Sequence, residues 1–189
     1  MKKSNKFFAI LILVILAIPM FNSCKKGADD PFISLRSRSG RLKGIWNLTS
    51  GTETYTSGSS TYTETYTESM VTVSYSGASQ TYTHTESIEF DKANAFKSTV
   101  MHDGSITTCD GFWAFMDGYG DVKNSECVVI RLSSQTSGGT ITTYTGDDMP
   151  SYILRFDKLS GSEAIIQATG TTVGSSTDTD TSNKTYTKK

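Results

Sequence analysis

The chain has 189 residues, and 166 remain after a leader of 23 residues, which is the size of one domain. Those 166 residues carry 15 Lys and Arg against 19 Asp and Glu, so the net charge near −4 argues against a nucleic-acid partner. The sequence contains no catalytic triad, phosphate-binding loop or serine elbow, so we expect neither an enzyme nor a cofactor.

The first 23 residues predict a secretory leader. A basic start with three lysines precedes the apolar run Phe7–Met20, whose roughly 14 residues are fewer than the ~20 that span a bilayer. The sequence Phe21-Asn22-Ser23-Cys24 resembles a bacterial lipobox, which places a lipid (palmitate) anchor on Cys24. We therefore expect a membrane-anchored lipoprotein with a leader over 1–23, a lipidated tether over 24–40 and a folded domain over 41–189.

The tether sequence is compatible with two cellular locations. Its acidic residues Asp29 and Asp30 resemble the surface-export signal of Bacteroidota lipoproteins, so the outer membrane is expected, on its periplasmic face or at the cell surface. The stretch Pro31–Arg41 is the only helix candidate. The basic residues between Arg36 and Lys43 predict either a solvated linker or contact with anionic headgroups.

Residues 52–67, TETYTSGSSTYTETYT, predict β-strands. They alternate strictly and are rich in the β-branched and aromatic types that strands favour, with turn residues at 57–60 and again at 76–79. The first turn pairs Tyr55 with Tyr62 and Trp46 with Val71, and the second pairs Val73 with Tyr82, with one continuous strand between the two turns. The apolar face then contains Trp46, Leu48, Val71, Val73, Tyr82, Ile88 and Phe90, and the outer face contains Tyr55, Tyr62, Glu64, Tyr66, Glu68, Thr81, Thr83 and Thr85.

Later hairpins complete the predicted sheet. Asn94 suits a left-handed turn that pairs Phe90 with Phe96, and Asp103-Gly104 predicts the next hairpin. Further strands are expected at 127–133, 140–145, 151–157, 163–169 and 183–187, with loops that include 118–125 and 175–182. About eight to ten sequential antiparallel strands with one apolar face predict an all-β up-and-down barrel, and a two-sheet β-sandwich is the alternative.

Several segments resemble a known family. The segment 41–48, RLKGIWNL, resembles the G-x-W start of lipocalins. The segments 88–96, 111–113 and 152–159 resemble lipocalin-like lipoproteins of Bacteroidota, and the resemblance spans most of residues 30–170. The resemblance implies a lipocalin-like barrel and a location in the cell envelope.

The expected barrel suggests two functions. Aromatic residues on the inner face predict a pocket for a small hydrophobic ligand, and they are Trp46, Tyr82, Phe90, Phe96, Trp113 and Phe115. The alternative is a surface interaction or structural module that binds a protein or glycan through the outer tyrosines Tyr55, Tyr62 and Tyr66.

Two smaller groups of residues predict a metal site and a disulfide. The hairpin register sets His84 opposite His102, with Glu86 on the same face, which predicts a candidate zinc site. A histidine pair without metal at the barrel mouth is the alternative. Cys109 and Cys127 lie in a compartment that permits a disulfide, although their predicted strand faces differ.

Overall fold

The computed structural model describes residues 37–116, 126–171 and 179–189. The leader, Cys24, the tether up to residue 36 and the loop expected at 118–125 lie outside the described residues. The described elements are α2 (Arg38–Leu42), β1 (Gly44–Ser57), β2 (Ser60–Thr67), β3 (Met70–Tyr75), β4 (Ala78–Phe90), β5 (Ala95–His102), β6 (Ser105–Met116), β7 (Glu126–Ser137), β8 (Thr140–Thr143), η3 (Gly146–Asp148), β9 (Ser151–Leu159), β10 (Glu163–Thr171) and β11 (Thr179–Lys188).

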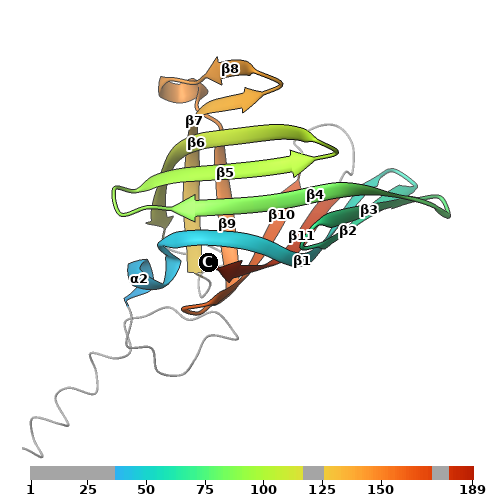
Figure 1. Ribbon diagram of the computed structural model, residues 1–189, viewed down its shortest axis with the longest axis horizontal. Coiled ribbons are helices and arrows are strands. Elements are labelled where there is room, and N and C mark those ends of the chain that lie inside the picture. Colours follow the sequence, from blue (N-terminus) through green and yellow to red (C-terminus); the bar gives the residue numbers. More distant parts are fainter. Residues whose placement is uncertain (1–36, 117–125, 172–178) are drawn as a thin grey trace, which may run out of the picture.

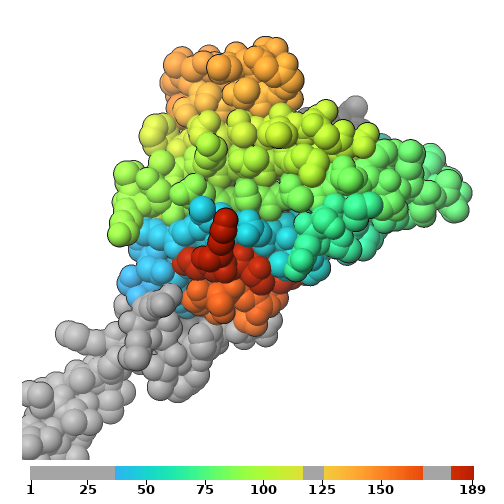
Figure 2. All heavy atoms as spheres, in the orientation of Figure 1, coloured from blue at the N-terminus to red at the C-terminus, as the bar shows by residue number. Residues whose placement is uncertain are grey.

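The strands form a closed antiparallel barrel, which confirms the up-and-down barrel and excludes the sandwich (Figure 1). Ten strands follow the order β6-β5-β4-β3-β2-β1-β11-β10-β9-β7, and pairing of β6 with β7 closes the circle. Closure gives each of these ten strands a hydrogen-bonded neighbour on both sides. The short β8 pairs only with the far end of β7 and, with η3, forms the orange block at the top of Figures 1 and 2.

The number of strands around the barrel differs between its two ends. Where β1 begins, Gly44–Asn47 pair directly with Ser87–Phe90 of β4, so eight strands form the wall. Further along, the hairpin β2–β3 is inserted between β1 and β4 and widens the wall to ten strands. This hairpin forms much of the projection at the right of Figure 2.

The inserted hairpin corrects the predicted continuous strand. The chain reverses at Glu68 and Ser69, where the Thr67 side chain both accepts from the Met70 amide and donates to the Met70 carbonyl. As a result Trp46 pairs with Ile88 and not with Val71. No Gly, Pro or Asn marks this turn, so the alternating pattern alone does not reveal it.

The second predicted turn is displaced by one position, which shifts the pairing by two residues. Ser76 and Gly77 take positive φ angles of 48° and 82°, so the turn has two residues and Val71 pairs with Tyr82. An even shift leaves each side chain on its face, so the predicted apolar face is confirmed. Trp46, Leu48, Val71, Ile88 and Phe90 are buried, with Val73 and Tyr82 packed against them.

A β-bulge in β1 overturns the outer face predicted for β1 and β2, whereas the three threonines predicted on it from β4 are exposed as expected. The register of β1 against β11 shifts between Leu48 and Ser50, so the inward positions change from even to odd numbers. Glu53 therefore faces inward, and its neighbours on β2 do the same. Tyr62 and Glu64 line an interior hollow, and Tyr66 is only 5 % exposed.

Helix α2 closes the eight-stranded end. Ser37 caps its first turn, Leu42 is fully buried, and the Leu42 carbonyl accepts a 2.7 Å bond from the Trp46 indole. Arg38 Nε and Arg41 Nη2 lie 2.7 and 3.4 Å from the carboxylate of the fully buried Glu126. Two of the basic residues expected to be solvated or to contact headgroups therefore bind the barrel instead.

The last strand is longer than expected. β11 begins at Thr179 and pairs with β1 and β10, so the end of the loop predicted at 175–182 belongs to a strand. The extension places Asp180 beside β1, where it joins Lys184 in the polar interior described below.

Candidate functional site

The barrel contains an apolar cavity of about 290 Å³. The side chains that line it come from β4, β5, β6, β7, β9, β10 and β11, and they are Glu86, Ile88, Phe96, Ser98, Cys109, Ile130, Leu132, Gln135, Tyr152, Leu154, Ile166 and Tyr186. Tyr152 is largely exposed, so the cavity reaches solvent beside it. Alternation along each strand points these residues to the interior.

Glu86 supplies the charge on the cavity wall. Its Oε1 accepts a 2.6 Å bond from the Tyr186 hydroxyl, and its Oε2 lies 3.0 Å from Lys184 Nζ. Burial raises the pKa of Glu86, but the nearby His84 ring, the Lys184 ammonium and the Tyr186 hydroxyl together lower that pKa to about 2. Burial and the Glu86 charge raise the pKa of Tyr186 well above its ordinary value. Glu86 is thus an ionised carboxylate and Tyr186 a neutral donor.

A chain of polar side chains continues from Glu86 toward β1 and β2. Lys184 Nζ also lies 3.3 Å from Glu53 Oε2, and the Tyr66 hydroxyl donates to Glu53 at 2.5 Å and contacts Glu64 as well. Burial lowers the pKa of Lys184, but the carboxylates of Glu86 and Glu53 outweigh it and raise the pKa. Lys184 is therefore charged and shared between two carboxylates.

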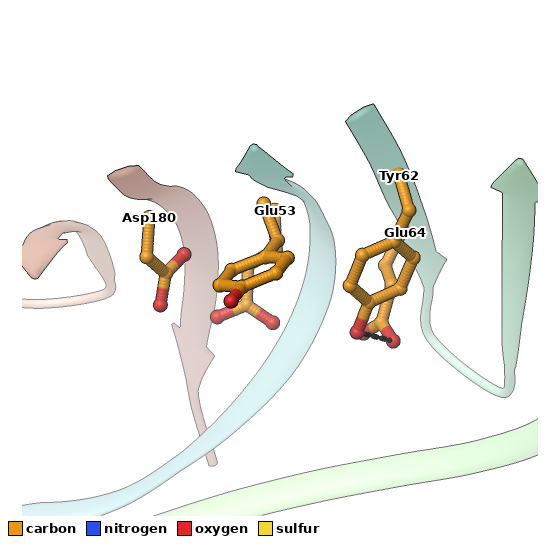
Figure 3. A pocket seen from close by; sticks show the side chains of 5 residues that line it. Glu53, Tyr62, Glu64 and Asp180 are labelled. Atoms are coloured by element: carbon orange, nitrogen blue, oxygen red, sulfur yellow. Dashed lines mark hydrogen bonds between the residues drawn. The ribbon is translucent and has the colours of Figure 1, made fainter. Parts of the chain in front are cut away.

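The chain ends at an acidic hollow of about 320 Å³ (Figure 3). Neighbouring strands β11, β1 and β2 supply its lining, which consists of Glu53, Tyr55, Tyr62, Glu64 and Asp180. The Tyr62 hydroxyl donates to Glu64 at 3.0 Å, and burial followed by this bond raises the pKa of Tyr62 to about 12. Burial and the charge of Glu53 raise the pKa of Asp180. Negative charge thus accumulates at this end of the barrel.

Most residues of the predicted ligand pocket lie elsewhere. Phe96 alone of the six lines the apolar cavity. Trp46, Phe90 and Trp113 belong to the packed core, while Phe115 lies under Arg38 and Tyr82 beside His102. Large aromatic rings fill the closed end, so the open volume remains where smaller residues such as Ser98 and Cys109 face inward.

The candidate zinc site is wrong. His84 does pair with His102, and their ring centres are 5.9 Å apart. His84 Nε2, however, lies 3.9 Å from Glu86, whose oxygens are bound by Lys184 and Tyr186. Within the residues that the structure describes, no three His, Cys, Asp or Glu side chains converge as ligands of a metal ion.

The candidate disulfide is also wrong. Cys109 pairs with Gln135 on β7, whereas Cys127 pairs with Met116 on β6, so about seven strand positions, or roughly 23 Å, separate them. The structure contains no bond between the two cysteines. Cys109 faces the cavity, as its predicted inward position requires, and Cys127 is fully buried.

No family model matches the chain, and no curated protein or solved structure matches it. None of the described helices is long and apolar enough to cross a membrane. The function is therefore inferred from the barrel and its interior.

Proposed function

We propose that this protein is a lipid-anchored, non-catalytic cell-envelope protein that binds a small hydrophobic molecule inside a lipocalin-like barrel. The apolar cavity carries this proposal. An engineered 150 Å³ apolar cavity holds benzene, so about 290 Å³ accommodates roughly ten to twelve carbon atoms. The volume lies at the lower end of the range of about 300–1,000 Å³ typical of ligand pockets.

The sequence supports the envelope address. The lipobox-like segment before Cys24 and the resemblance to Bacteroidota lipoproteins both favour the outer membrane. Incorporation of labelled palmitate into the wild-type chain, and its loss in Cys24→Ala, is the expected result. Incorporation that persists in Cys24→Ala contradicts the anchor.

Ligand binding is tested by filling the cavity. Ser98 lines it from β5, whereas the neighbouring Lys97 points outward. We expect the purified protein to enhance the fluorescence of N-phenyl-1-naphthylamine, Ser98→Phe to abolish this enhancement, and Lys97→Phe to retain it. Overpacking costs about 1–3 kcal/mol, so thermal melting must show that both variants are folded. Equal enhancement by the wild type and a folded Ser98→Phe variant contradicts an interior site.

The alternative surface module loses its structural basis. Its three tyrosines do not share an outer face, because Tyr66 is buried and Tyr62 donates to Glu64 inside the barrel. Tyr55 packs edge-on against Tyr62 at 5.9 Å and lines the same acidic hollow. We therefore do not propose a partner for this hairpin.

A further inference from the structure

The charges around the cavity specify the class of ligand. We propose that the cavity takes an amphiphile with an apolar tail and a positively charged amine head, accepts the corresponding alcohol more weakly, and rejects the fatty acid. This inference rests on the proposed binding function and adds the chemistry of the head group to it.

Glu86 is the first observation behind the proposal. It is the one charged side chain among the described residues that line the cavity, and its side chain is 14 % exposed. Its two oxygens each accept from one protein donor, Tyr186 and Lys184, which leaves lone pairs for a further donor. Lys184 is absent from the lining, so a ligand meets the carboxylate and not the ammonium.

The shortage of positive charge is the second observation. Lys184 is shared between Glu86 and Glu53, and beyond Glu53 lie Glu64 and Asp180. The described groups of this region thus hold four carboxylates against one ammonium and the His84 ring, whose Nε2 lies 3.9 Å from Glu86 Oε2. An amine adds the missing positive charge, whereas a carboxylate adds a fifth negative one beside Glu86. Partial exclusion of water strengthens both effects.

The apolar walls fix the rest of the ligand. Ile88, Ile130 and Leu132 are buried side chains, and together with Phe96, Leu154 and Ile166 they make much of the lining apolar. A tail of about ten carbons matches the volume. Decylamine, decanol and decanoate therefore form a matched series that differs only in the head group.

The experiment is displacement of N-phenyl-1-naphthylamine from the purified protein at pH 7.5 by these three compounds, each in its monomeric range. We expect decylamine to bind most tightly, decanol to follow, and decanoate to bind at least roughly a hundredfold more weakly than decylamine. Glu86→Gln should reduce the amine-to-carboxylate ratio by at least about tenfold. Glu89→Gln removes the same charge from the outward side of the same strand, where Glu89 pairs with Lys97, and should leave the ratio unchanged.

A second variant covers the case in which Glu86→Gln does not fold. Ser98→Lys introduces a cation into the lining and should shift the preference toward decanoate. Decanoate that binds the wild type as tightly as decylamine overturns the inference but leaves the cavity as a binding site. Absence of probe binding to the wild type overturns the proposed function and this inference with it. A ratio that neither Glu86→Gln nor Ser98→Lys changes also overturns the role of Glu86.

Discussion

The two ends of the barrel bury charge in opposite ways. At the closed end Glu126 is fully buried between Arg38 and Arg41, and aromatic side chains fill the surrounding space. At the wide end Lys184 lies between Glu53 and Glu86, with Asp180 and Glu64 nearby. The first arrangement supplies two cations to one anion among packed aromatic side chains. The second supplies one cation to several anions and adjoins open volume.

The closed end therefore uses its buried charges for stability, whereas the charges of the wide end are available for ligand recognition. A buried carboxylate with cationic partners holds α2 across the barrel end, where loss of one member leaves an uncompensated charge. At the wide end the described carboxylates outnumber the described ammonium groups, and excess negative charge favours recognition of a cation. The comparison gives three expected effects, from the largest to the smallest.

Removal of the Glu126 carboxylate should have the largest effect. Glu126→Ala leaves the guanidinium groups at the closed end without this anion, and we expect the free energy of unfolding to fall by about 3–5 kcal/mol. Glu163→Ala, which breaks the partly exposed pair with Lys158, should lower the free energy of unfolding by less than about 1 kcal/mol. Urea unfolding of both variants measures the difference. Similar losses of unfolding free energy in the two variants would show that the stability of the closed end does not depend on its buried ion pair.

Removal of the shared cation should alter acid stability. The pKa of Glu86 is about 2 in the folded protein and near 4.5 when unfolded. Its contribution is therefore fully present above about pH 4.5 and is lost as the pH falls toward 2, with a total of at most about 3 kcal/mol. Lys184→Met should raise the folded pKa and shrink this acid-dependent loss. Urea unfolding from pH 3 to pH 6 measures it, and identical pH slopes in both proteins would contradict the assignment.

Removal of one hydroxyl should have the smallest effect. Tyr66→Phe deletes the donor to Glu53 and the contact with Glu64 but keeps the buried ring. A hydrogen bond to a charged group is worth about 1.5–3 kcal/mol, and we expect a loss near the lower limit because water reaches the adjoining hollow. Tyr75→Phe at the exposed hairpin is the control and should change stability by less than about 0.5 kcal/mol. Equal melting curves for both variants would contradict a structural role of the Tyr66 hydroxyl.

Much of the barrel follows from the sequence because strand alternation and turn residues are local signals. Asn94 and Asp103 mark two turns and have positive φ angles, and the pairs of Phe90 with Phe96 and His84 with His102 that the Asn94 turn predicts are confirmed. The same signals give the inward face of Trp46, Leu48 and Val71. They do not give the reversal at Glu68 and Ser69, whose turn uses the Thr67 side chain in place of a glycine.

The interior of the wide end is where local patterns fail. One bulge after Leu48 exchanges the two faces of β1, so residues that alternate as an outer face become the polar lining. Glu86 was identifiable from its position beside His84, but its true partners lie about a hundred residues away on β11. Nothing in the local sequence pairs Lys184 or Tyr186 with it.

The sequence by itself determined the strand class, most hairpins, the apolar face and the expectation of a lipid anchor, because each depends on residues close together in the chain. Only the tertiary structure decided which volume stays open and which charges remain uncompensated. Barrel closure brings β4, β5, β6, β7, β9, β10 and β11 around one space, and the sizes of side chains from distant strands determine whether that space is filled. The aromatic residues fill one end, and the smaller residues leave the cavity beside Glu86.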